Sequence, residues 1–103
     1  MFGKFGDMMG KLQDMKQRVE LIKEKLESTV LEAEAAGGDI KIKINGNRKV
    51  LSVQIATALQ HGNKEELEEQ LTVAMNRAIQ KADVENESQM KEAASGILPP
   101  GMF

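Results

Sequence analysis

The sequence contains no cysteine, tryptophan or tyrosine, and its three phenylalanines lie at the ends of the chain, at positions 2, 5 and 103. Without cysteine there is no disulfide, no thiolate nucleophile and no cysteine-ligated zinc. Without internal aromatic rings there is no platform on which unpaired bases could stack. Leu, Ile, Val, Met and Ala therefore have to form the hydrophobic core of this 103-residue chain, which has the length of one domain.

Long apolar runs are missing as well, because no stretch approaches the ~20 residues that span a bilayer. The N-terminal residues also lack the continuous apolar segment of a signal peptide. These two absences predict a cytoplasmic protein without a membrane partner.

Motifs for catalysis or small ligands are absent. The one histidine, His61, lies in a Gln-His-Gly-Asn turn without an accompanying nucleophile or carboxylate motif, which is typical of a solvated loop residue. Gly37 and Gly38 lead into a strand and are not part of a phosphate-binding Gly-Lys-Ser/Thr loop. No Asp-x-Asp or His-x-x-His spacing indicates a metal site. We therefore expect no enzymatic activity, no metal, no cofactor and no small-molecule substrate.

Positive charge is scarce and unevenly distributed. The formal net charge is -2, so any contact with a polyanion has to use a local basic surface. Residues 39–58 contain four basic side chains against one acidic side chain, whereas residues 59–103 contain four basic against eight acidic ones. The middle of the chain is thus basic and its last part is acidic.

Residues 7–28 carry the pattern of a long amphipathic helix. Apolar residues recur there in steps of four and three, which is the a/d seam of a heptad repeat. The seam consists of Met8, Leu12, Met15, Val19, Ile22 and Leu26. Basic residues flank it on both sides, and we call them the two basic rows: Lys11, Arg18 and Lys25 at g positions, Lys16 and Lys23 at e positions. Acidic residues occupy the opposite, outer face.

Pairing of this helix along its own copy would set basic rows against basic rows, whether the copies run parallel or antiparallel. We therefore expect the helix to pack on another element. The rows have two interpretations, which the sequence leaves open. Their stems can cover the apolar seam while the charged ends stay in water, or the rows can hold an anionic backbone.

The middle of the chain predicts a three-stranded antiparallel meander. Residues 39–45 alternate between isoleucines on one face and Lys41 and Lys43 on the other, and Asn45-Gly46 is a strong hairpin signal. The alternation resumes over residues 49–55, where we expect Leu51, Val53 and Ile55 to be buried. Residues 30–36 can form the first strand, turning at Gly37-Gly38, although helix propensity favours continuing the first helix through them.

A second long helix is predicted to begin after Asn63, which forms a capping box with Glu66. The apolar stripe of this helix is explained by core packing and consists of Leu67, Leu71, Ala74, Met75, Ala78, Ile79 and Ala82. The stripe thins after residue 83, which suggests either a break near residues 86–88 or a partner subunit. The helical pattern runs to Ser95-Gly96. We expect one α+β domain over residues 1–103, with flexible tails at 1–6 and 97–103.

Several short motifs together resemble the YbaB/EbfC family of bacterial nucleoid-associated proteins. They are the Met-Phe-Gly-Lys start, the Met/Gln/Lys-rich helix, the Ile44-Asn-Gly46 turn, Val53-Gln-Ile55 and the Leu98-Pro-Pro-Gly101 tail. The resemblance covers essentially the whole chain. It implies a homodimer formed through the central region with helices projecting like tweezers, binding of double-stranded DNA in the nucleoid, and a role in gene regulation without catalysis.

The resemblance and the charge pattern combine into one hypothesis. Two joined subunits present their basic rows to the phosphates of a duplex, so binding is strongly salt-dependent and has little sequence preference. The expected DNA contacts are Lys11, Lys16, Arg18, Lys23 and Lys25, with Lys41, Lys43, Arg48 and Lys49 as secondary candidates. The alternative is a protein-interaction module, in which the methionine-rich seam receives an amphipathic segment of another protein.

Overall fold

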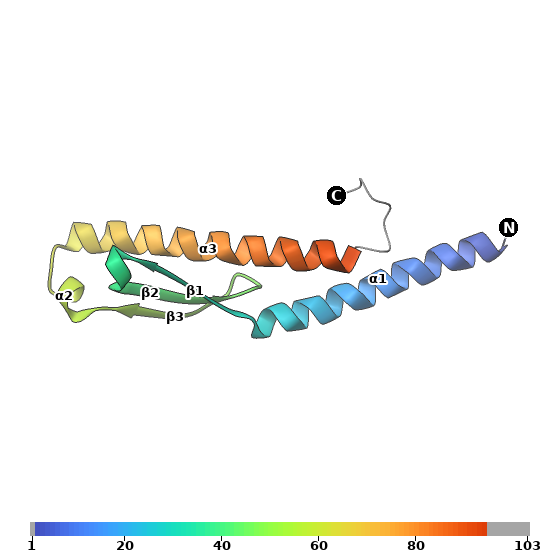
Figure 1. Cartoon of the computed structure of the whole chain (residues 1–103), viewed down its shortest axis with the longest axis horizontal. Coiled ribbons are helices and arrows are strands. Elements are labelled where there is room, and N and C mark those ends of the chain that lie inside the picture. Colours follow the sequence, from blue (N-terminus) through green and yellow to red (C-terminus); the bar gives the residue numbers. More distant parts are fainter. Residues whose placement is uncertain (1, 95–103) are drawn as a thin grey trace.

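The computed structural model describes residues 2–94, with side chains from residue 8 onward. Helix α1 (Phe2–Ser28) leads into strand β1 (Val30–Ala35), the 3-10 turn η1 (Ala36–Gly38), and strands β2 (Ile40–Asn45) and β3 (Val50–Ile55). The short helix α2 (Thr57–Gln60), which the sequence patterns did not indicate, precedes the long helix α3 (Lys64–Ala94). Figure 1 shows α3 lying along the sheet, while the N-terminal half of α1 projects past the end of α3.

The sheet is the predicted antiparallel meander, in the order β1-β2-β3. Residues 30–35 form a strand and do not continue the first helix. Its alternate residues Ala33 and Ala35 are buried beneath α3, and its backbone pairs with β2, which together override the helix propensity. On the outer face of the sheet, Glu32 is opposite Lys43 and Glu34 is opposite Lys41.

The core lies between the sheet and α3. Three isoleucines of β2 and three alanines of α3 are fully buried there: Ile40, Ile42, Ile44, Ala74, Ala78 and Ala82. The alanines form one face of the helix and have no side chain beyond Cβ, so the helix axis can approach the sheet closely. The stripe predicted from the sequence therefore packs as expected, although Ile79 at its margin is exposed.

The burial predicted for β3 is wrong for Leu51 and Val53, whereas Ile55 is half-buried. Leu51 and Val53 are 47% and 45% exposed, although Val53 is paired with the fully buried Ile42 and so lies on the same face of the sheet. The reason is that α3 packs over β1 and β2 and leaves β3 largely uncovered. Leu51 has no partner on β2, because Ile44 pairs with Val50 and Lys43 pairs with Ser52. This irregularity in the register adds to the exposure of Leu51.

Helix α3 begins as predicted and does not break. The Asn63 Oδ1 atom accepts hydrogen bonds from the backbone N–H groups of Glu65, at 2.8 Å, and Glu66, at 3.3 Å. The helix continues through residues 86–88, so the predicted weak point is not a boundary. Helix α1 starts at Phe2, before the predicted start at residue 7. The predicted helix end at Ser95-Gly96 and the tail at 97–103 lie outside the described residues.

Gly46 is required by close packing against α1. The Asn45-Gly46 pair does mark the hairpin, but within the turn the residue with a left-handed backbone is Arg48, with φ of 66°. A Cβ atom at residue 46 would lie 2.5 Å from Leu26 Cδ2 and 3.0 Å from Leu26 Cβ. These distances are shorter than van der Waals contact, and Leu26 is fully buried and cannot move aside freely.

We expect Gly46→Ala to destabilise the protein by about 1–3 kcal/mol, because it overpacks the junction between α1 and the hairpin. In thermal unfolding this corresponds to a melting temperature lower by roughly 4–8 °C per kcal/mol. Gly10→Ala is the matched control, since a Cβ at Gly10 meets nothing within 4 Å, and it should stabilise the helix slightly. Equal melting temperatures for the two variants would contradict this role of Gly46.

Candidate nucleic-acid interface

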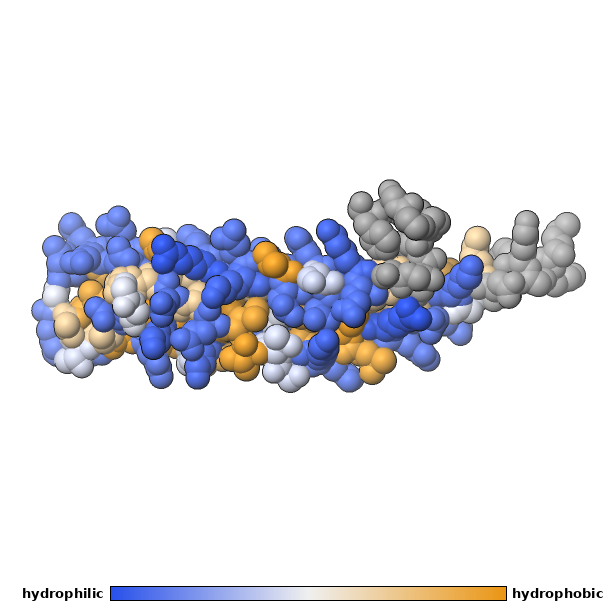
Figure 2. Space-filling model, in the orientation of Figure 1, coloured by the Kyte–Doolittle hydropathy of each residue, from blue (hydrophilic) through white to orange (hydrophobic). Residues whose placement is uncertain are grey.

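The two basic rows flank an apolar seam that is buried at one end of α1 and open at the other. Leu26, next to the sheet, is fully buried, whereas Leu12, near the projecting end, is 60% exposed. Figure 2 shows apolar side chains reaching the surface among hydrophilic ones beneath α1 and along the lower edge of the sheet. The rows are therefore displayed on a helix that is attached to the body mainly through its C-terminal half.

Within residues 8–94, one side chain of the rows forms an ion pair, and Arg18 and Lys25 line a groove with Glu92 of α3. Arg18 forms an exposed ion pair with Asp14 one turn away, at 3.5 Å, and Lys25 donates to Gln89 Oε1 on α3 at 3.3 Å. Among the side chains of residues 8–94, Lys16 and Lys23 have no ion-pair or hydrogen-bond partner. An exposed ion pair such as Arg18–Asp14 contributes at most about 1 kcal/mol, so a phosphate can replace the carboxylate.

The sheet lysines lie in a balanced environment. Lys41 and Lys43 are exposed on the outer face, directly across from Glu34 and Glu32 of β1. Opposite charges at directly paired positions attract one another. The outer face of the first two strands therefore carries two positive and two negative side chains, and it presents no net charge to a polyanion.

Arg48 and Lys49 are engaged within the molecule. Arg48 Nε binds the carboxylate of Asp83 on α3, and Lys49 Nζ lies 2.9 Å from Glu27 Oε1 at the end of α1. Both side chains thus connect the hairpin turn to a helix, and each is paired with a carboxylate.

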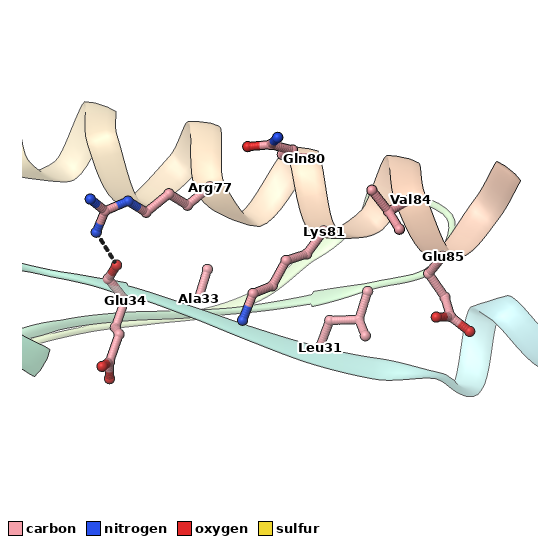
Figure 3. A pocket seen from close by; sticks show the side chains of 8 residues that line it. All are labelled: Leu31, Ala33, Glu34, Arg77, Gln80, Lys81, Val84 and Glu85. Carbon is pink, nitrogen blue, oxygen red and sulfur yellow. Dashed lines mark hydrogen bonds between the residues drawn. The ribbon is translucent and has the colours of Figure 1, made fainter. Parts of the chain in front are cut away.

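Two further basic residues, which the sequence patterns did not single out, protect the open edge of β1. Arg77 Nη1 donates to the backbone oxygen of Glu34 at 3.0 Å, and Lys81 Nζ donates to that of Glu32 at 2.6 Å. Figure 3 shows both side chains descending from α3 to β1, beside an open groove of about 510 Å³. The sequence did contain a signal for these two residues. Their spacing of four residues places both side chains on the same face of the helix, next to the alanine stripe.

Within residues 8–94, side-chain cover on the open edge of β3 lies at its last residue, where Gln60 Nε2 donates to the backbone oxygen of Ile55 at 2.7 Å. Ala56 N donates a hydrogen bond to Asp39 O of the neighbouring chain segment. In an antiparallel pair the backbone groups of alternate residues point to the same side. The N–H and C=O of Gln54 therefore point toward β2, and those of Val53 point to the open side. The exposed Val50 and Val53 side chains lie on the same face of the sheet as the buried isoleucines, over the strand that α3 does not cover. Ile79, one turn before the Asp83 that binds Arg48, extends this apolar surface onto the α3 flank.

The Glu27 carboxylate is stabilised in its charged form. Hydrogen bonds from Asn47, at 2.8 Å, and from Lys49, at 2.9 Å, hold the pKa of Glu27 below its ordinary value of 4.5. A carboxylate whose pKa is lower in the folded than in the unfolded state stabilises the fold above the unfolded pKa. This contribution is lost as the pH falls through the folded pKa.

Acidification below pH 4.5 should therefore reduce the free energy of unfolding, and the decrease should be shallower in Glu27→Gln, which has no carboxylate to protonate. Urea denaturation of both proteins at a series of pH values below neutrality measures the difference. Identical pH dependences would show that the hydrogen bonds to Glu27 do not stabilise the fold.

Other kinds of site find no support in the described part of the chain. Residues 2–94 hold no group of three or more His, Cys, Asp or Glu side chains placed to bind a metal ion. Within the same residues no helix is both long and apolar enough to cross a membrane.

Comparison with known proteins identifies the family. The model of the YbaB/EbfC DNA-binding family matches residues 1–97. The chain belongs to the YbaB/EbfC DNA-binding family. One relative, from Flavobacterium johnsoniae, is 38% identical over 97 residues, which is 92% of this chain and 91% of the relative. Another, from Hahella chejuensis, is 33% identical over 99 residues, covering 95% and 92%. Both are named nucleoid-associated proteins.

The fold of this YbaB/EbfC chain also has a counterpart among solved structures. The crystal structure of an uncharacterised protein from Helicobacter pylori superposes with a TM-score of 0.79 at 23% sequence identity. The match covers 85% of this chain and 94% of the other. It supports the arrangement of helices and strands described above.

Proposed function

We propose that this protein binds double-stranded DNA as a homodimer, mainly through backbone phosphates, and alters the conformation of the duplex. Its proposed role is nucleoid organisation and gene regulation, without catalysis. The proposal is supported by the two basic rows of exposed lysine and arginine side chains on α1, in a chain that belongs to a DNA-binding family. Lysine and arginine are the side chains that contact phosphate most often, and such contacts carry no sequence information directly.

The contacts assigned to phosphate are Lys11, Lys16, Arg18, Lys23 and Lys25. Lys41, Lys43, Arg48 and Lys49 have carboxylates opposite them or bound to them. We therefore assign these four no direct contact with DNA.

The acidic charge of α3 does not oppose this assignment at its densest point. Glu65 and Glu66 lie in the first turn of α3, which Figure 1 places at the end of the molecule away from the projecting part of α1. The molecule is 71 Å long, several times the ~8 Å screening length at physiological ionic strength. A duplex held along α1 is thus screened from these glutamates.

Homodimerisation is assigned to the open edge of β3. The edge of β1 is occupied by Arg77 and Lys81, whereas β3 offers unpaired backbone groups beside the exposed Val50 and Val53. Pairing of β3 with the same strand of a second copy would join two sheets and bury both apolar surfaces. It would also place two sets of basic rows in one molecule, which raises avidity for a polyanion.

One observation favours a second function, docking of an amphipathic segment of another protein. The seam of α1 is exposed at Met8 and Leu12, and methionine side chains adapt readily to different partners.

Titration of the protein with a short duplex at about 0.05 M and about 0.5 M salt separates the two functions. Five phosphate contacts from each subunit, about ten in a dimer, predict that the logarithm of the affinity falls with the logarithm of the salt concentration with a slope of about -9. Tight binding at low salt that is lost at high salt supports DNA binding. Absence of binding at low salt would contradict it and leave the protein-docking function.

A further inference from the structure

The turn formed by residues 45–49 is the point at which α1, the hairpin and α3 meet. Gly46 N donates to the backbone oxygens of Leu26, at 2.9 Å, and Thr29, at 3.2 Å, and so binds the end of α1. Asn45, whose side chain is almost completely buried, donates from Nδ2 to the backbone oxygen of Glu27 at 3.3 Å. The last turn of α1 therefore rests directly on the hairpin.

Two other side chains of this turn reach along α1. Asn47 Nδ2 lies 3.0 Å from the backbone oxygen of Lys23 and 2.8 Å from Glu27 Oε2. Lys49 Nζ binds the other carboxylate oxygen of Glu27 at 2.9 Å. Lys23 and Glu27 are one helical turn apart, so these contacts fix the direction of the helix axis as well as the position of its end.

The same turn is fastened to the body of the protein. Asn86 Nδ2 on α3 donates to the backbone oxygen of Gly46 at 3.1 Å, and Arg48 binds Asp83 one turn earlier on the same helix. Asn45 Oδ1 accepts from the N–H groups of Asn47, at 2.9 Å, and Lys49, at 3.0 Å, which holds the turn in shape. The path from α3 through the turn to α1 is a continuous set of hydrogen bonds.

We infer that Asn47 and Lys49 are positioning residues, which fix the angle at which α1 leaves the sheet and thereby the placement of the basic rows. For DNA this inference rests on the proposed function. In a dimer the two pairs of rows bind one duplex together only if both helices point in the required directions. A helix that samples several directions lowers the effective concentration of its rows at the duplex.

This role can be distinguished from direct phosphate contact. A lysine that contacts phosphate contributes about 0.9 to the salt slope in each subunit, so its loss from a dimer reduces the slope by about 1.8. A positioning residue lowers the affinity at every salt concentration and leaves the slope unchanged. Asn47 carries no charge and so makes no contribution to the salt slope. Lys49 is the more demanding test of the positioning role, because its side chain is 67% exposed and could reach a phosphate.

The test uses full-length Asn47→Ala and Lys49→Met, with Lys43→Met as the matched control for loss of one lysine away from the turn. Because the chain has no cysteine, Gln13→Cys and Gln80→Cys can carry a pair of spin labels on α1 and α3. Labelled subunits are diluted in unlabelled protein. Dipolar EPR should show a broader or shifted distance distribution in both turn variants and an unchanged one in the control.

With duplex DNA, both turn variants should bind about five- to tenfold more weakly with salt slopes equal to that of the unsubstituted protein. Unchanged distance distributions would overturn the inference, and so would a slope reduced by about 1.8 in Lys49→Met. If the unsubstituted protein binds no DNA, the proposed function fails, while the EPR distances still decide whether the turn positions α1. If Asn47→Ala does not fold, as judged by circular dichroism, the exposed Lys49→Met provides the same test.

Discussion

Arg18→Gln/Lys23→Gln should bind duplex DNA on the order of 10³-fold more weakly than the unsubstituted protein at about 0.1 M salt. When the salt concentration is lowered from about 1 M to about 0.1 M, each phosphate contact raises the affinity on the order of eightfold. The two substitutions remove one contact from each basic row, and so about four from a dimer. Fluorescence anisotropy of a labelled duplex measures the affinity, and the magnitude of the salt slope should fall by about 3.6.

Lys41→Gln/Lys43→Gln is the matched control, because it removes the same number of charges from an exposed surface. These lysines lie across from Glu34 and Glu32, so we expect their loss to change DNA affinity by no more than about twofold. Light scattering should show that both double variants remain dimeric. Equal losses of affinity would assign DNA binding to overall charge, and no loss in Arg18→Gln/Lys23→Gln would contradict the assignment to the rows.

Val53→Asp should convert the dimer into monomers and weaken DNA binding by about 10²–10⁴-fold. A charge at this position would have to be buried without a partner when β3 edges meet, which disfavours the dimer strongly. In a single subunit Val53 is 45% exposed, so the subunit itself should remain folded. The loss of DNA affinity follows from the loss of bivalent binding. Sedimentation velocity measures the mass, and anisotropy measures the affinity.

Val30→Asp is the control for this second prediction. Val30 is a β-strand valine of similar exposure, 56%, on the strand whose edge is covered by Arg77 and Lys81. It should leave the protein dimeric and its DNA affinity unchanged. A dimer that survives Val53→Asp but dissociates in Val30→Asp would place the interface on β1 and would refute the assignment to β3.

Local patterns in the sequence were sufficient for the two long helices and for strands β2 and β3. The heptad seam of residues 7–28 and the alternating isoleucines of residues 39–45 each have a period that only one kind of element satisfies. For residues 30–36 the local signals conflicted, because alternation favoured a strand and composition favoured a helix. Packing of Ala33 and Ala35 beneath α3 decided it, and this contact joins parts of the chain more than 35 residues apart.

The candidate site was predictable only where it lies on one helix. The basic rows follow from helical geometry, which places residues at fixed angles around a single axis. Arg48 and Lys49 were secondary candidates in the sequence, and the structure pairs them with Asp83 and Glu27, which are 35 and 22 residues away. Such pairs depend on how elements approach one another. The exposure of Val53 depends in the same way on which strands α3 covers, and alternation within β3 carries no information about that.

The salt dependence of DNA binding by a dimer and by a monomer shows whether both subunits contact the duplex through their basic rows. The measurement compares the slope of log affinity against log salt for the unsubstituted protein and for Val53→Asp, with the same short duplex. Our account predicts that the slope of the dimer is twice that of the monomer, because each subunit contributes the same phosphate contacts from its basic rows. Equal slopes would show that one subunit makes all the contacts with DNA, and would contradict the account.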